Sequence, residues 1–247
     1  MQTVSDLPPP PPLGSLREQG PVALFLDFDG TLVHLAETPE GIVVPERLAA
    51  RLAQVADQLG GALALISGRA VVDLERHCGP LEIARAGSHG IDRRLANGTA
   101  LGLAPEPMPA AAADRLRGFA SEQGLRLETK PHGSALHYRE NPAAEAAGRD
   151  FAQSLAAEHG LVVKHGKFVI ELVLPGADKG GAVRAFMQEA PFAGCTPIFV
   201  GDDVTDEDGM AAAAELGGFG VLVGDWRPTV ARHRLADPGT VHDWLGL

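Results

Sequence analysis

Short apolar runs alternate with amphipathic stretches along most of this chain, beginning at Pro21. Val22 to Asp27 is a nearly continuous apolar run that ends in an acid, and Ala62 to Ile66 is a second such run. Between them, Pro45 to Leu59 carries apolar residues at helical spacing. Buried strands that alternate with helices are typical of a parallel sheet covered on both faces. The pattern therefore predicts an α/β fold with a doubly wound, Rossmann-like parallel sheet.

The rhythm changes after Gly90. Asn97-Gly98 suggests a hairpin turn, and the stretches that follow place strand pairs beside helices, which suits a small inserted α+β domain. The βα rhythm resumes at Lys179. We expect a proline-rich flexible tail at residues 1–20, a core domain at residues 21–90 and 175–247, and an inserted domain at residues 91–174. Further helices are predicted over 69–77, 110–123, 143–158 and 179–189, and further strands over 81–86, 125–130, 135–139, 168–173, 197–200 and 218–223.

Composition excludes several classes of protein. With 247 residues, 45% of them hydrophobic, the chain has enough apolar material for a core, which excludes a disordered chain. The net charge of −11 argues against nucleic acid as a partner, because phosphate backbones bind basic surfaces. No uncharged apolar run approaches the length of a membrane span, and the first residues lack a signal-peptide pattern. We therefore expect no membrane association and a cytoplasmic location.

Two smaller features carry expectations of their own. Cys78 and Cys195 lie far apart without a C-x-x-C spacing, so we expect buried, reduced thiols rather than a disulfide or a zinc site. Pro8 to Pro12 is a polyproline run, which favours an extended conformation over packed structure. We interpret this run as part of the tail, with a docking ligand for another protein as the alternative.

The first acidic motif follows the first predicted strand. Asp27 and Asp29 come directly after it, at the carboxyl end of a sheet strand, where open α/β sheets bind their ligands. Two carboxylates placed one residue apart repel each other unless a cation lies between them. The alternative is an ordinary turn at a strand end, and Gly30-Thr31 next to the acids favours the functional interpretation.

A second group of acids follows another apolar run. Asp202 and Asp203 begin it, and the carboxylates continue to residue 208. An acidic helix N-terminus is the alternative explanation, and it suits Glu207 and Asp208. The two acidic groups together provide the oxygen ligands that Mg²⁺ prefers.

A hydroxyl and an ammonium complete the set. Ser67-Gly68 ends the second predicted strand, where the serine caps a helix or binds a phosphate. Lys179 lies at a helix start, which is unfavourable for a cation unless it binds an anion. A carboxylate nucleophile, a hydroxyl, an ammonium and metal-binding acids are the groups that phosphoryl transfer requires.

These residues resemble the four motifs of haloacid dehalogenase-type phosphatases, and the insert resembles their larger α/β cap. Further motifs in the insert and around it are similar to those of trehalose-6-phosphate phosphatases. The resemblance extends over about residues 23–245. The residues that carry it are Asp27-x-Asp29-Gly30-Thr31, Ser67-Gly68-Arg69, Lys179, Gly201-Asp202-Asp203, Gly87-Ser88-His89-Gly90, Lys130-Pro131, His137-Tyr138-Arg139 and Gly166-Lys167 with Glu171.

The resemblance implies a role for each motif. Asp27 is the expected nucleophile, Asp29 the general acid and base, and Lys179 the cation beside them. The phosphate would be bound by Asp27, Asp29, Gly30, Ser67, Gly68 and Lys179, and Mg²⁺ by Asp27, the backbone carbonyl of Asp29, and Asp202. Asp203 and Asp206 are expected to support the site or to cap a helix.

The expected substrate is trehalose 6-phosphate, and functional coupling to a trehalose-6-phosphate synthase is an accompanying expectation. The resemblance assigns recognition of the sugar to His89, Glu128, Lys130, His137, Arg139 and Glu171. The alternatives are another sugar-phosphate phosphatase, acting on sucrose phosphate, on mannosyl-phosphoglycerate or on many substrates, a phospho-acceptor module without turnover, and a noncatalytic regulatory partner. Asp29 and the large cap argue against the phospho-acceptor module, which needs neither.

Overall fold

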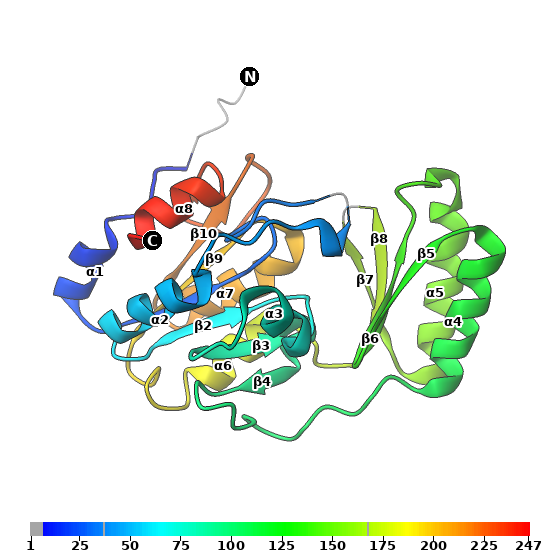
Figure 1. Ribbon diagram of the computed structural model, residues 1–247, viewed down its shortest axis with the longest axis horizontal. Helices are drawn as coiled ribbons and strands as arrows, with labels where there is room; N and C mark the ends of the chain where they lie inside the picture. The colour runs from blue at the N-terminus through cyan, green and yellow to red at the C-terminus, as the bar shows by residue number, and fades with distance from the viewer. Residues whose placement is uncertain (1–6, 37, 167) are drawn as a thin grey trace. The chain divides into compact units, whose positions relative to one another are not determined.

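The computed structural model describes residues 7–36, 38–166 and 168–247, which form two compact units (Figure 1). We call Met1–Leu103 with Asp178–Leu247 the core unit, and Ala104–Ala177 the cap unit. Each unit has its own sheet and its own hydrophobic cluster.

The core unit contains a seven-stranded sheet with the order β11-β10-β9-β1-β2-β3-β4. All neighbouring strands pair in parallel except β4, which is antiparallel to β3. The predicted α/β core with a parallel sheet is therefore confirmed. The strands are β1 (Val22–Leu26), β2 (Leu63–Ile66), β3 (Ala84–Gly87), β4 (Asp92–Arg94), β9 (Thr196–Gly201), β10 (Phe219–Val223) and β11 (His233–Leu235).

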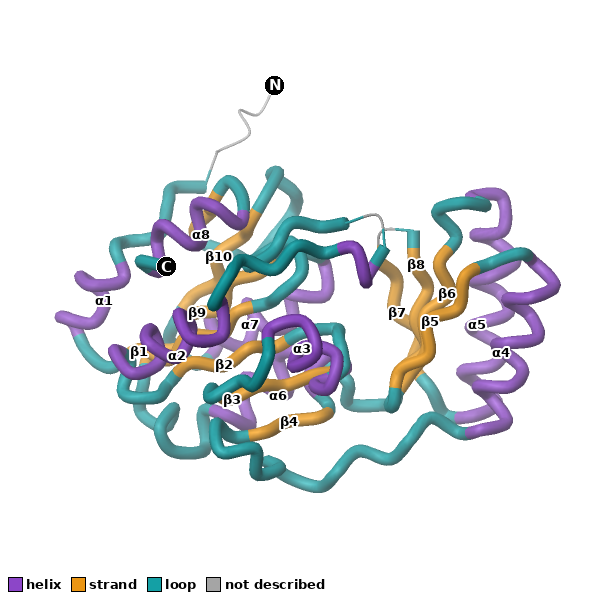
Figure 2. Tube along the Cα trace, in the orientation of Figure 1, coloured by secondary structure: helices purple, strands orange, loops and turns teal. Residues whose placement is uncertain are grey.

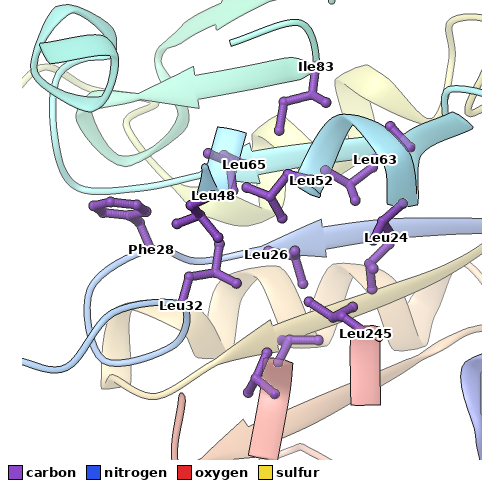
Figure 3. Close-up of a cluster of buried hydrophobic side chains, with 14 of the residues drawn as sticks. Leu24, Leu26, Phe28, Leu32, Leu48, Leu52, Leu63, Leu65, Ile83 and Leu245 are labelled. Atoms are coloured by element: carbon purple, nitrogen blue, oxygen red, sulfur yellow. The ribbon is translucent and has the colours of Figure 1, made fainter. Parts of the chain in front are cut away.

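Helices cover both faces of this sheet because alternate strand residues point to opposite sides. Leu24 and Leu26 of β1 join one hydrophobic cluster, part of which is drawn in Figure 3, and Ala23 and Phe25 join the other. The first cluster includes residues of α1 (Leu13–Gln19), α2 (Leu48–Gln58), α3 (Val71–Cys78) and α8 (Pro238–Leu245), and the second includes residues of α6 (Lys179–Phe186) and α7 (Glu207–Glu215). Short 3₁₀ helices lie at η1 (Pro39–Gly41), η2 (Ser88–Gly90) and η4 (Val204–Asp206).

The cap unit is a four-stranded antiparallel sheet with the order β5-β6-β8-β7 and two helices on one face (Figure 2). Leu136, Ile170 and Leu172 point toward the helices, where they are buried against Leu116 and Leu155. The opposite face carries charged side chains. The elements are β5 (Arg126–Lys130), β6 (Gly133–His137), β7 (Val162–Gly166), β8 (Val169–Val173), α4 (Ala110–Gln123), α5 (Glu145–His159) and η3 (Pro142–Ala144).

The inserted unit begins later than the sequence predicts. The Asn97-Gly98 turn does form a hairpin, in which the Leu95 amide donates to the Thr99 carbonyl at 2.8 Å. However, this hairpin belongs to the core unit, because Arg93 of β4 pairs with Ala86 of β3. The strand β4 covers an edge of the core sheet that would otherwise be open. Residues 91–103 therefore lie in the core unit, and residues 175–177 lie in the cap unit.

The proline-rich segment is packed onto the core unit and is not the free tail that we predicted, at least from residue 7 onward; residues 1–6 lie outside the described residues. The Trp244 indole donates to the Pro11 carbonyl at 2.8 Å, and the Arg234 amide of β11 donates to the Pro8 carbonyl at 3.0 Å. Leu13 is buried in the first hydrophobic cluster. A proline run has no amide donors but keeps its carbonyl acceptors, so it can satisfy donors of an edge strand and a helix.

We expect Trp244→Phe to destabilise the protein by about 1 kcal/mol, because it removes the donor to Pro11 and keeps the aromatic packing. For a chain of this size, that loss lowers the melting temperature by about 2–4 °C, which calorimetry would measure. Trp226→Phe is the matched control, because Trp226 is 45% exposed. Equal melting temperatures for the two variants would contradict a stabilising role of the proline segment.

Among the described residues, no helix is long and apolar enough to cross a membrane.

Cys78 and Cys195 are free thiols, as predicted, but both are only partly buried. Burial raises the pKa of the Cys78 thiol to about 11. This thiol is therefore protonated and weakly nucleophilic at neutral pH.

Candidate active site

The predicted core residues come together at the carboxyl ends of three neighbouring strands. In the sheet, β1 lies between β9 and β2. Asp27 and Asp29 follow β1, Ser67 follows β2, and Asp202 follows β9. The strands that follow β1 in the chain are added first on one side of it (β2 and β3) and later on the other side (β9 and β10). Ligands of open α/β sheets bind at the point where the strand order changes sides in this way.

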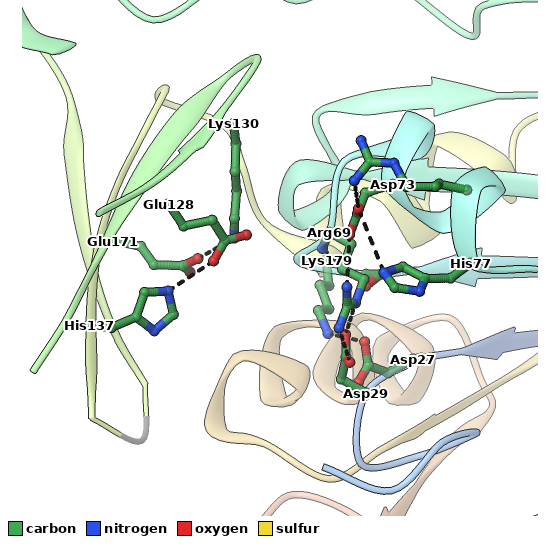
Figure 4. A network of polar contacts seen from close by, with 12 residues as sticks. Asp27, Asp29, Arg69, Asp73, His77, Glu128, Lys130, His137, Glu171 and Lys179 are labelled. Atoms are coloured by element: carbon green, nitrogen blue, oxygen red, sulfur yellow. Dashed lines mark hydrogen bonds and ion pairs between the residues drawn. The ribbon is translucent and has the colours of Figure 1, made fainter. Parts of the chain in front are cut away.

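Lys179 links two of the carboxylates (Figure 4). It is the first residue of α6 and is 2% exposed. Its ammonium donates to Asp27 Oδ1 at 2.7 Å and to Asp206 Oδ1 at 2.5 Å. Burial alone would lower the pKa of Lys179, but the carboxylates of Asp206 and Asp27 outweigh burial and raise it. The lysine therefore carries a fixed positive charge beside Asp27.

Asp27, Asp202 and Asp206 each place a carboxylate oxygen within 4.8 Å of the others. Asp206 uses both oxygens already, since Oδ2 accepts from the Asp203 amide at 2.9 Å. Asp202 Oδ1 is buried and has no hydrogen-bond partner among the described residues. Burial and repulsion from Asp206 raise the pKa of Asp27, and raise that of Asp202 to about 7.

These observations fit a divalent cation. When all three carboxylates are ionised, the ammonium of Lys179 compensates only one of their charges, and a bound cation would compensate the other two. Among the described residues, Lys179 binds only one oxygen of Asp27 and Asp202 Oδ1 has no hydrogen-bond partner, whereas both oxygens of Asp206 are engaged. Hard oxygen ligands of this kind suit Mg²⁺.

Gly30 has a steric reason to be glycine. A Cβ atom at this position would lie 2.1 Å from Asp202 Oδ2, far closer than two atoms can approach, and its φ of +80° also favours glycine. The glycine after Asp29 therefore lets the Asp202 carboxylate lie against the chain that follows β1.

Asp29 is held by an arginine that we did not predict as a site residue. Arg69 Nε and Nη2 bind the two oxygens of Asp29 at 2.7 and 2.8 Å, and Nη1 binds Asp73 at 2.8 Å. A two-pronged pair of this kind fixes the orientation of a carboxylate. The sequence signal was present, because Arg69 follows Ser67-Gly68 directly.

Ser67 does not cap α3, which begins at Val71; instead, Ser67 Oγ accepts from the Arg69 amide at 3.1 Å. His89, predicted to contact the sugar, is 5% exposed and lies against this turn. A Cβ atom at Gly68 would lie 2.8 Å from His89 Cε1. Ser88 and His89 both adopt positive φ angles, a strained conformation that is typical of functional loops.

The cap unit gathers four of the predicted recognition residues on the sheet face that points away from its helices (Figure 4). His137 Nε2 lies 2.9 Å from Glu128 Oε2, and Lys130 donates to Glu171 Oε1 at 2.5 Å. Burial would raise the pKa of Glu128, but the hydrogen bond to His137 and the charge of Lys130 outweigh it and lower that pKa. A face with donors and acceptors held in place suits a polyhydroxylated ligand.

Arg139 lies outside this group. It is exposed, and its guanidinium carbon lies 5.4 Å from the centre of the Phe168 ring. The pairing register instead adds Arg126 and Lys164 to the charged face, since Lys164 lies opposite Glu171. Sequence reasoning missed Lys164 because it did not predict β7. Lys167 lies outside the described residues.

The fold is shared with a solved phosphatase of the haloacid dehalogenase superfamily from Bacteroides thetaiotaomicron, with 18% identity, a TM-score of 0.61 and coverage of 92% and 93%. Residues 25–237 match the family described as trehalose-phosphatase. This chain belongs to the trehalose-phosphatase family.

Individual relatives agree with this assignment. The chain is 41% identical over 228 residues to the trehalose-6-phosphate phosphatase of Escherichia coli (strain K12), covering 91% of this chain and 85% of that protein. It is similar to a trehalose-6-phosphate phosphatase related protein of known structure, with 26% identity, a TM-score of 0.75 and coverage of 91% and 95%. The C-terminal domain of Candida albicans trehalose-6-phosphate phosphatase, with 22% identity, a TM-score of 0.81 and coverage of 99% and 100%, shares the fold.

Proposed function

We propose that this protein hydrolyses trehalose 6-phosphate to trehalose and phosphate in a Mg²⁺-dependent reaction, as the last step of trehalose synthesis. The observation that carries the proposal is the contact of buried Lys179 with Asp27 at the end of β1, in a chain of the trehalose-phosphatase family. Cytoplasmic location and functional coupling to a trehalose-6-phosphate synthase belong to the same proposal.

Asp27 acts as the nucleophile. One of its carboxylate oxygens attacks phosphorus, the bond from phosphorus to the sugar oxygen breaks, and an aspartyl-phosphate forms. Lys179 holds Asp27 Oδ1, so the carboxylate enters the reaction with a fixed orientation. Water then attacks phosphorus, the bond to Asp27 breaks, and phosphate leaves.

Asp29 moves the protons. It protonates the departing sugar oxygen in the first step and takes a proton from the attacking water in the second. Arg69 orients Asp29 through two hydrogen bonds. Ser67 and Gly68 bind phosphate oxygens through hydroxyl and backbone groups, whereas the Gly30 amide donates to the Val33 carbonyl at 2.7 Å and is not assigned to the phosphate. Mg²⁺, bound by Asp27, the Asp29 carbonyl and Asp202, would neutralise the charge of the phosphoryl group.

The charged face of the cap unit recognises the sugar. Glu128, Lys130, His137 and Glu171 already satisfy one another, so a ligand must offer hydroxyl groups that replace these contacts. A sugar that lacks a matching hydroxyl leaves a charged group unpaired, which penalises its binding. We assign Arg139 and His89 no direct contact, because Arg139 lies on Phe168 and His89 is buried against Gly68.

A panel of phosphate esters tests the substrate. Phosphate release is measured from trehalose 6-phosphate, sucrose phosphate, glucose 6-phosphate and p-nitrophenyl phosphate, with Mg²⁺ and with EDTA. We expect Mg²⁺-dependent release that strongly prefers trehalose 6-phosphate. Similar rates for all sugar phosphates would overturn the substrate, while no release would favour a noncatalytic role.

Glu171→Gln separates recognition from chemistry in the same assay. We expect kcat/KM for trehalose 6-phosphate to fall by about 10- to 100-fold, since a hydrogen bond to a charged group is lost. The rate with p-nitrophenyl phosphate, which has no sugar, should not change. The control is Glu158→Gln, an exposed glutamate of α5 in the same unit. Equal losses on both substrates would contradict a role of Glu171 in sugar recognition.

A further inference from the structure

The acid-rich loop of residues 202–208 has a second cation that sequence reasoning did not identify. Lys179 compensates one side of the loop through Asp206. On the other side, Arg227 of the segment between β10 and β11 forms an ion pair with Glu207. Both side chains are about one-fifth exposed. Arg227 is therefore largely buried and close to the loop that carries Asp202.

Arg227 does more than neutralise Glu207. Its Nε donates to the Asp202 carbonyl at 3.2 Å, and its Nη2 donates to the Asp203 carbonyl at 2.6 Å. The second oxygen of Glu207 accepts from the Val230 amide at 2.8 Å, which ties the glutamate to the same segment. The guanidinium thus binds two successive backbone carbonyls and one carboxylate. A planar guanidinium, with its several N–H donors in fixed directions (the fork), can bind these three acceptors at once, whereas a lysine ammonium cannot match that arrangement.

The Asp202 side chain depends on this backbone for its position. One carboxylate oxygen lies against Gly30, and the other has no hydrogen-bond partner among the described residues. Within the described part of the chain, no side-chain hydrogen bond to that second oxygen holds the carboxylate toward Asp27. Its direction is set by the backbone of residues 202 and 203, which Arg227 fixes through their carbonyls.

We propose that Arg227 is a positioning residue that holds Asp202 ready to bind the divalent cation. This inference rests on the proposed function, which places the cation at Asp27 and Asp202. The groups that orient metal ligands commonly change metal affinity by about 10- to 100-fold when they are removed. A merely structural ion pair between Arg227 and Glu207 would affect stability but not metal affinity.

Calorimetric titration with Mg²⁺ tests the proposal on the purified full chain. We expect the Kd for Mg²⁺ to rise about 10- to 100-fold in Arg227→Gln. Arg227→Lys keeps the charge but not the fork, so it should recover only a small part of this loss. The Mg²⁺ concentration for half-maximal phosphate release should rise in parallel. Arg184→Gln is the control, because Arg184 forms an exposed ion pair with Glu215, and it should bind Mg²⁺ like the wild type.

Thermal unfolding of each variant shows whether it is folded. A Kd within twofold of the wild-type value in folded Arg227→Gln would overturn the positioning role. A wild-type Kd in Arg227→Lys would overturn the role assigned to the planar guanidinium. If the wild type itself binds no Mg²⁺, the metal assignment fails and this inference fails with it. The wild-type titration alone distinguishes that case from a failure of Arg227.

Discussion

Asp27→Asn should reduce phosphate release from trehalose 6-phosphate by at least about 1,000-fold, because an amide cannot replace a carboxylate nucleophile. The substitution keeps the size of the side chain and an oxygen that accepts from Lys179, so the fold should survive. Burial raises the pKa of Asp27, which means that its negative charge is unfavourable in the folded chain. Removal of that charge should therefore give a melting temperature equal to or higher than that of the wild type. The measurements are phosphate release with Mg²⁺ present and thermal unfolding.

Asp57→Asn, on the exposed side of α2, is the control for the loss of one carboxylate and should keep full activity. Acid quenching of the wild type during turnover should trap phosphate bound to protein, and Asp27→Asn should trap none. Activity above one-tenth of the wild-type rate in Asp27→Asn would contradict its assignment as the nucleophile.

Lys179→Met should be the most destabilising of the changes considered. It leaves the carboxylates of Asp27 and Asp206 buried without their cation, which costs about 3–5 kcal/mol of unfolding free energy. It should also abolish activity, because it frees the orientation of Asp27. Urea unfolding at pH 8 measures the loss of stability.

The pH dependence of this loss has a definite sign. A carboxyl with a raised pKa binds its proton more tightly in the folded chain than in the unfolded chain, so a lower pH favours folding. Burial and Asp206 already raise the pKa of Asp27, and removal of the lysine raises it further. The stability deficit of Lys179→Met should therefore be smaller at pH 5 than at pH 8.

A second variant identifies the cause of the destabilisation. Asp206→Asn combined with Lys179→Met removes one of the two unpaired charges, so the double variant should be more stable than Lys179→Met alone. If Lys179→Met loses less than about 1 kcal/mol of unfolding free energy at pH 8, Lys179 does not compensate the charges of these two carboxylates.

The core sheet was predictable because its central strands are unbroken apolar runs. The strands β1, β2, β9 and β10 are buried along most of their length, and the sequence pattern places each of them within a few residues. The edge strands β7 and β11 escaped prediction. Val162–Gly166 and His233–Leu235 are short, mixed in polarity and partly exposed, so they carry neither a continuous apolar run nor a clean alternation.

The proline segment was misjudged for a related reason. Its polar partners are the Trp244 indole and an edge of β11, and neither is visible in the local pattern. The inserted unit was recognised, but its first boundary was placed too early because the Asn97-Gly98 hairpin was assigned to it.

The candidate site was predictable where a residue stands at a strand end. Asp27, Ser67 and Asp202 follow β1, β2 and β9, so the parallel sheet itself brings them together. The supporting residues were harder to predict, because their contacts join distant parts of the chain. Arg69 is 40 positions from Asp29, and Arg227 is 25 positions from Asp202. Such pairs depend on tertiary packing, which no local spacing encodes.

The two units have separate hydrophobic clusters, and every strand of each sheet pairs within its own unit. The residues assigned to bond breaking all belong to the core unit, whereas the charged face assigned to the sugar comes from the single continuous segment Ala104–Ala177. A crossover at two points of the gene would therefore exchange one recognition module for another without disturbing the sheet that carries the nucleophile. We expect such an exchange to change the sugar that is recognised and to leave the groups assigned to bond breaking in place.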